Sequence, residues 1–325
     1  MDDHDDDASD DVRRLFVTLN IVYLNTIFAL FGIFANVINM RVFVKQGFSE
    51  NINISLFVLA VADLGELLTV MVFSVCNNPA FAGAGLPLSP SDFINVVAAF
   101  PRGVLSHIKS CVTAFITFER CMCVVLPLKV KAIITTRVTV FFLCVIIVGM
   151  AVTLIPFYQS VRIDWQYDIT LNRTILSAIF SEGGGSADMN AILSTYTGVQ
   201  VGTFLAVSLF SFILAFKLWL QSKFRSQQAH SSENAKRQNS KKSATTIALV
   251  ITMAATYVTC YSPGILILLV GFVEPRFSVF GSLVNYFMVC VSYTILFESI
   301  NSSVTIFLYF AMSTNYRKTL FTLFR

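Results

Sequence analysis

The chain has 325 residues, of which 55% are hydrophobic and only 13% charged, with a mean hydropathy of +0.72 and a formal net charge of +4. Soluble proteins carry roughly 25% charged residues, so the composition excludes an ordinary soluble globular protein. Apolar runs recur from residue 15 to residue 310 with no Gly/Ser/Pro-rich linker between them, which favours one membrane bundle.

Seven stretches are long and apolar enough to cross a bilayer, which takes about 20 residues. We therefore expect an all-α membrane protein, a seven-transmembrane helix bundle, with spans near 17–43, 54–76, 93–124, 138–158, 190–216, 244–272 and 278–310. Met1 to Asp11 holds seven Asp and no Lys or Arg, so it has no basic n-region and we expect no signal peptide ahead of span 1. Span 1 itself is then expected to act as the insertion signal.

The basic residues predict the orientation of the bundle. Lys and Arg number 15 in one set of loops and tail and 5 in the other, with three more inside the spans. Because cytoplasmic loops carry the excess, we expect a plasma-membrane protein whose acidic N-terminal segment, 1–16, is extracellular. The sequence Asn172-Arg173-Thr174, in the loop after span 4, is then a glycosylation sequon on the outer side.

The segment 311–325 follows the bundle, 17–310, on the inner side. Tyr316, Leu320 and Phe324 recur there at i, i+4 and i+8, with Arg317 and Lys318 off that stripe. This pattern predicts a short amphipathic eighth helix lying on the inner membrane surface. The alternative is a frayed apolar tail.

Seven charged residues lie within the spans, where a charge costs a few kcal/mol or more and faces the bundle interior. On span 3, Arg102, Lys109 and Arg120 fall within about 20° of one angle around the helix. Asp63 and Glu66 give span 2 an acidic face. Span 7 offers a polar face made of Glu298, Asn301, Ser302, Thr305 and Tyr309. We expect an interior polar network between spans 2, 3 and 7; for Glu66 and Glu298 the alternative is that it only fixes helix packing.

Short motifs along the spans carry a family resemblance. Span 1 has Phe34-Ala35-Asn36-Val37, span 2 Leu59-Ala60-Val61-Ala62-Asp63-Leu64, span 3 Phe118-Glu119-Arg120-Cys121 followed by Pro127-Leu128, span 6 Cys260-Tyr261-Ser262-Pro263, and span 7 the run Asn301 to Tyr309. In order and spacing these resemble the rhodopsin-like (class A) G-protein-coupled receptors. The segment around Arg120 is most similar to divergent invertebrate orphan peptide or chemosensory receptors.

The resemblance implies a receptor in which an extracellular peptide or small molecule shifts a two-state bundle and the inner face activates a heterotrimeric G protein. Glu119 would hold Arg120 at rest through a charge-assisted pair, Pro263 would kink span 6, and Tyr261 would report ligand to the kink. Tyr309 ends the span 7 motif. We expect no enzyme activity, no cofactor or metal site and no nucleic-acid partner, with membrane lipids as further contacts.

Two departures from the family pattern are informative. The family usually ties the outer end of span 3 to the loop after span 4 by a disulfide, yet residues 159–189 contain no Cys. In span 7, Thr305-Ile306 stands where the family has Asn-Pro.

Other seven-helix classes fit less well. Residues 278–310 contain no lysine for a retinal Schiff base, and His107 is the only histidine within the spans, too few for a zinc-dependent hydrolase. The prolines show no symmetry between two halves, which a transporter would have. A channel or transporter that uses the intramembrane charges is kept as the alternative function.

Arg102 and Glu66, with Tyr261, are the candidate ligand-binding residues. Arg102 lies about 27 Å from Arg120 along the helix axis, in the outer third of the membrane, where a guanidinium favours an anionic group on a ligand. The competing interpretation is that Arg102 only pairs with Glu66 or Glu298.

Lys109 lies about 16 Å from Arg120, near the bilayer centre. Many members of the resembled family hold a sodium ion there against the acid matching Asp63, with polar groups matching Asn301 and Ser302. The ammonium of Lys109 would supply that positive charge itself, and its desolvation requires an acid close by. We expect Asp63 to be its partner, with Glu298 second, and no sodium dependence of ligand affinity.

Overall fold

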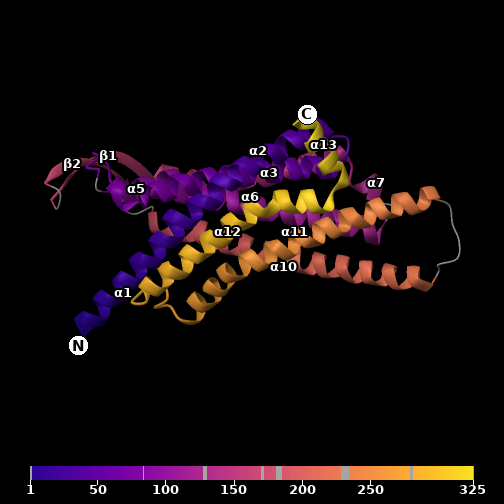
Figure 1. Ribbon diagram of the computed structural model, residues 1–325. Helices are drawn as coiled ribbons and strands as arrows, with labels where there is room; N and C mark the ends of the chain where they lie inside the picture. Colours follow the sequence, from indigo (N-terminus) through magenta and orange to yellow (C-terminus); the bar gives the residue numbers. More distant parts are fainter. Residues whose placement is uncertain are drawn as a thin grey trace.

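Long helices run side by side along one axis of the molecule (Figure 1). The computed structural model describes residues 2–82, 84–126, 130–169, 172–180, 185–227, 234–278 and 281–324. In chain order its elements are α1 Asp2–Val17, η1 Thr18–Leu24, α2 Asn25–Gln46, α3 Asn51–Cys76, α4 Pro79–Ala82, α5 Pro90–Ile94, η2 Asn95–Ala99, α6 Phe100–Val125, α7 Val130–Ile133, α8 Thr136–Val152, α9 Ile155–Ser160, β1 Val161–Asp168, β2 Arg173–Phe180, α10 Gly185–Gln227, α11 Asn234–Val273, α12 Val284–Met312 and α13 Thr314–Leu323.

Each predicted span corresponds to a long helical segment. Within the described residues, six segments have the length and composition to cross a membrane: Asp10–Gln46, Asn51–Cys76, Thr136–Ser160, Ser194–Leu220, Thr245–Val273 and Val284–Met312. The seventh is α6, which packs against α3, α8, α10 and α11. Its four charged residues make α6 less apolar than the other six segments. The same four residues are the charged side chains predicted on span 3.

The helices run past the predicted span limits. α1 joins α2 through the π-helical turn η1, so the acidic segment is helical and continuous with span 1. α10 and α11 extend beyond the bundle as a pair, to Gln227 and from Asn234 (Figure 1). Lysine, arginine and glutamine in this stretch are good helix formers, which explains why a polar loop sequence continues both helices.

Close packing brings the first and last spans together at Gly32. A Cβ atom added to Gly32 would overlap Ser303 of α12 and Leu67 of α3. Ser303 Oγ donates a hydrogen bond of 2.8 Å to the carbonyl of Phe28. The absence of a side chain at Gly32 thus allows α2 to approach the polar face of α12.

The loop after span 4 forms an antiparallel hairpin, which the all-α prediction omitted. β1 pairs with β2 in a register that sets Val161 opposite Phe180 and Asp168 opposite Arg173. Asn172, in the turn, has a left-handed backbone with φ of 49° and accepts a hydrogen bond from Tyr167. Apolar and polar residues alternate along β1, the period-2 pattern of a strand, so the signal is in the sequence.

The two ends of the bundle carry different structures. The N-terminus and the hairpin lie at one end, whereas α13 and the tips of α10 and α11 lie at the other (Figure 1). α13 begins at Ser313, whose hydroxyl accepts a hydrogen bond from the backbone N–H of Tyr316. This cap gives the predicted eighth helix its start. Phe321 of this helix and Phe324, directly after it, are exposed.

Candidate functional site

The centre of the bundle holds a buried lysine between three helices. Lys109 of α6 donates hydrogen bonds to Glu66 Oε2 of α3 and, at 2.8 Å, to Ser302 Oγ of α12. Ser302 Oγ in turn donates to Glu66 Oε2 at 3.0 Å. The side chains of Lys109 and Glu66 are 1% and 0% exposed. Charges this deeply buried are stable only when paired and hydrogen-bonded, and the three residues form a closed triad.

The structure corrects the predicted order of partners for Lys109. Glu66 is the direct partner, and the predicted one, Asp63, lies 3.9 Å from the Lys109 Nζ atom, beyond hydrogen-bonding distance. The two acids are one turn apart on α3, and counting along the chain cannot rank them because the rotation of α3 against α6 decides which carboxylate faces the ammonium. Glu298, predicted second, does not pair with Lys109.

Glu298 instead pairs with Arg102. The Arg102 Nη1 atom donates to Glu298 Oε2 at 2.5 Å, and the two side chains are 18% and 10% exposed. Among the described residues the buried Nε–H of Arg102 has no hydrogen-bond partner. The guanidinium is therefore paired on one edge and has a free donor on another.

Tyr261 links this cluster to span 6. The ammonium of Lys109 lies 5.3 Å from the centre of the Tyr261 ring, a cation–π contact. The Tyr261 hydroxyl shares a hydrogen bond of 3.1 Å with Ser106 of α6, and its ring stacks on Tyr257 with centroids 4.2 Å apart. Pro263 lies two residues further along α11, so the ring contact links the lysine to the part of α11 that contains the proline.

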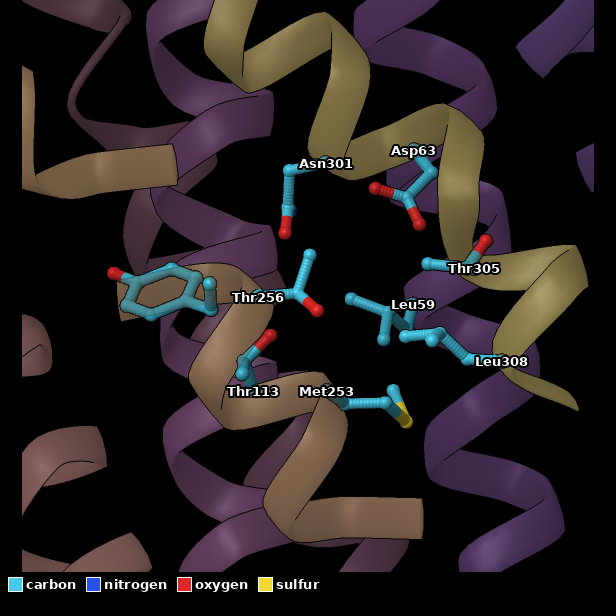
Figure 2. A pocket seen from close by; sticks show the side chains of 9 residues that line it. Leu59, Asp63, Thr113, Met253, Thr256, Asn301, Thr305 and Leu308 are labelled. Atoms are coloured by element: carbon cyan, nitrogen blue, oxygen red, sulfur yellow. The ribbon is translucent and has the colours of Figure 1, made fainter. Parts of the chain in front are cut away.

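A small cavity with both polar and apolar side chains in its wall adjoins Asp63 (Figure 2). The side chains of Asp63, Asn301 and Thr256 point toward one another across it, and Thr113 and Thr305 also line it. Its volume of about 20 Å³ is room for about one water molecule. Asn301 and Thr305, predicted members of the network, therefore surround this space rather than the lysine.

The polar network extends to span 1, which the sequence reasoning did not include. Asn36 Nδ2 donates to the carbonyl of Ser302 at 2.9 Å, and Asn39 Nδ2 donates to Thr305 Oγ1 at 3.3 Å. Tyr316 of α13 donates to Asn39 Oδ1 at 2.6 Å. The spacing of Asn36 and Asn39, i and i+3 within an apolar span, was a signal that could have revealed this face.

The predicted coupling residues Glu119 and Arg120 lie near the C-terminal end of α6. Arg120 Nη2 donates to Glu119 Oε1 at 2.9 Å; Glu119 is 2% exposed and Arg120 17%. Pro127-Leu128, part of the same motif, lies outside the described residues.

Tyr309, near the C-terminal end of α12, packs among aromatic rings. Its ring centre lies 5.3 Å from that of Phe43 and 5.5 Å from that of Tyr316. Burial raises the pKa of Tyr316 above its usual value, so its hydroxyl stays protonated and donates to Asn39. These three aromatic residues line a cavity of about 370 Å³ between α2, α3, α11, α12 and α13, to which Arg120 does not contribute.

In the part of the chain that the structure describes, seven long helical segments surround a buried charge cluster and an amphipathic helix follows the last, an arrangement typical of serpentine membrane receptors. The family described as "Serpentine type 7TM GPCR chemoreceptor Srw" matches residues 23–325, and the chain belongs to this family. No curated protein matches the chain. The protein is thus a multi-pass G-protein-coupled receptor of a chemoreceptor class that binds extracellular ligands, with G-protein coupling implied by the family. The match confirms the resemblance to chemosensory receptors and favours a receptor over a channel or transporter.

Proposed function

We propose that this chemoreceptor recognises an anionic group on its ligand with Arg102. The observation that carries the proposal is the Arg102–Glu298 pair, a charged hydrogen bond of 2.5 Å on the outer half of α6 with a free guanidinium donor beside it. A guanidinium binds carboxylates through two parallel N–H groups. A ligand carboxylate can therefore take the place of the Glu298 carboxylate.

A ligand shifts the populations of two states only if it binds one of them more tightly. Here the ligand carboxylate would bind more tightly to the state in which Glu298 has left Arg102. Glu298 and Ser302 are one turn apart on α12, and Ser302 bonds to Lys109, which contacts the Tyr261 ring. Release of Glu298 from Arg102 moves this turn of α12. The movement reaches α11 next to Pro263, where the helix lacks one backbone hydrogen bond and bends more easily.

At the inner end of the bundle, we propose that activation releases Arg120 from Glu119 and that the G protein then binds Arg120. Tyr309 contributes through the cavity that it lines with Phe43 and Tyr316. In this proposal the receptor lies in the plasma membrane with segment 1–16 outside, the bundle at 17–310 and the helix of 311–325 on the cytoplasmic face against lipid.

Replacement of Arg102 by Gln is the test of ligand recognition. We expect the half-maximal concentration of a carboxylate ligand to rise about tenfold or more, because a charged hydrogen bond contributes about 1.5–3 kcal/mol. An uncharged amide analogue should lose less than about threefold. The measurement is a second-messenger dose–response with matched acid and amide pairs, and Arg162→Gln, an exposed arginine of the hairpin, is the control. Equal losses for acid and amide would assign Arg102 a packing role alone.

Orientation is tested by the sequon in the hairpin turn. Asn172 and Thr174 are exposed at the end of the molecule that carries the N-terminus. We expect Asn172→Gln to lower the apparent mass by one glycan and an N-terminal epitope to be stained on intact cells. Staining that needs permeabilised cells would reverse the proposed topology.

A further inference from the structure

The β1–β2 hairpin is held to the bundle without a covalent bond. Residues 159–189 contain no Cys, and all seven cysteines of the chain are free. A two-stranded hairpin alone is marginally stable in water. Its position must therefore come from non-covalent contacts with neighbouring segments.

Those contacts converge on the segment that leads into α6. Asp92 of α5 accepts two hydrogen bonds through Oδ2, from Ser177 Oγ at 2.5 Å and from the backbone N–H of Ala178 at 3.3 Å. Leu176 exchanges backbone hydrogen bonds with the same segment, donating to Pro87 at 2.9 Å and accepting from Ser89 at 2.8 Å. β2 is thus bonded on one edge to β1 and on the other to residues 87–92.

We propose that Asp92 is the positioning residue that holds the hairpin over the N-terminal end of α6, in the place where a disulfide would otherwise tie them. Hydrogen bonds that involve an ionised group are roughly twice as strong as neutral ones, so this carboxylate is a strong point of the attachment. Arg173 of β2, which donates to the carbonyl of Gly85 at 2.6 Å, is a second one. The inference does not depend on the proposed role of Arg102.

Asp92 and Arg102, the proposed ligand-binding residue, lie on one continuous run of helical backbone. α5 continues through the π-helical η2 into α6 without a break in the helical backbone. Arg102 follows Asp92 by ten residues, or about 15 Å along the helix. The hairpin, which exposes Ile163, Trp165 and Tyr167 on one face of β1, is therefore fixed relative to Arg102 by a bond that does not depend on redox conditions.

The base of the hairpin is secured separately, which makes the role of Asp92 testable. Ala178 and Val161 pack against the buried side chains of Val96 and Phe157, and Phe157 stacks on Phe100 with ring centres 3.6 Å apart. Loss of the Asp92 carboxylate should free the strands while this apolar contact keeps the helices in place.

Trypsin on intact cells measures the hairpin's mobility. The probe is the full chain carrying a C-terminal tag and Asn172→Gln, which prevents shielding by a glycan. Cleavage after Arg162 or Arg173 reports on the hairpin, and cleavage after Arg276, in the loop before span 7, is the internal reference. In Asp92→Ala we expect hairpin cleavage to rise at least about fivefold relative to Arg276, and Ser177→Ala to give a smaller rise.

Matched variants separate this role from a general loss of structure. Asp92→Asn keeps an acceptor oxygen but loses the charge, so it should raise the ratio less than Asp92→Ala does. Asp164→Ala removes another hairpin carboxylate, one that bonds to the backbone N–H of Trp165, and should leave the ratio unchanged. An unchanged ratio in Asp92→Ala, or equal acceleration at all three arginines, would overturn the proposal. So would a rise in the wild-type ratio on treatment with extracellular dithiothreitol, because a disulfide would then be holding the hairpin.

Discussion

Replacing Lys109 by Met is expected to remove most of the receptor from the cell surface. The substitution keeps the length of the side chain but leaves Glu66 and Asp63 buried without a cation, and Glu66 loses the direct hydrogen bond of Lys109. Breaking a buried ion pair by removing one partner costs about 3–5 kcal/mol. Surface staining of a tagged receptor and the thermal stability of the solubilised protein measure the loss.

The rescue experiment distinguishes between the two acids. Because Glu66 is the direct partner and Asp63 lies 3.9 Å away, Lys109→Met combined with Glu66→Gln should recover more surface expression than Lys109→Met combined with Asp63→Asn. Gln can still accept from Ser302 in place of the carboxylate. If the Asp63→Asn combination recovered more, the ammonium would belong with Asp63, as the sequence alone predicted.

The same lysine leads to a prediction about cations. The Lys109 ammonium stands beside the small cavity that Asp63 lines, so a second cation there would be repelled. We expect the stability and ligand affinity of the wild-type receptor to be the same in sodium and choline chloride. Lys109→Met, where it reaches the surface, should become sensitive to sodium. Sodium-specific loss of ligand affinity in the wild type would contradict this account.

Replacing Arg120 by Ala is expected to abolish G-protein signalling while the receptor still reaches the surface. The Arg120 side chain lies near the C-terminal end of α6 and is 17% exposed, and it donates a hydrogen bond to Glu119 on its own helix. Its loss therefore breaks an ion pair within α6 and not one between helices. Ligand-stimulated second-messenger production, normalised to surface staining, is the measurement. Normal signalling by a well-expressed Arg120→Ala receptor would remove Arg120 from the proposed mechanism.

Glu119→Gln tests the resting state of the same pair. Gln still accepts a hydrogen bond but has no charge, and a charge-assisted bond is roughly twice as strong as a neutral one. Basal signalling without ligand should therefore rise several-fold, with the maximal response unchanged. A basal level equal to that of the wild type would show that Glu119 does not restrain Arg120.

Much of the fold was readable from the chain because a helix that crosses a membrane must be long and apolar whichever neighbours it packs against. The long uncharged runs predicted spans 4, 5 and 6, and Tyr316, Leu320 and Phe324 predicted the helix now seen as α13. The 100° step of a helix also placed Arg102 and Lys109 on one face of α6, and both side chains turn toward α3 and α12 in the structure.

The hairpin of β1 and β2 shows what sequence patterns could not predict about the loop after span 4. Alternation along 161–168 was available in the sequence, but it competed with the expectation of a loop between two spans. Its attachment to Asp92 joins residues 85 positions apart, and no local pattern predicts such a pair.

The tertiary structure decided which acidic side chain pairs with which basic one. Periodicity gives the direction of a side chain around its own helix, not the rotation and height of the neighbouring helix. Those follow from packing, such as the close approach of α2 to α12 and α3 at Gly32. The sequence therefore predicted that Lys109 needs a carboxylate, and the packing of α3, α6 and α12 selected Glu66 for it and left Glu298 to Arg102.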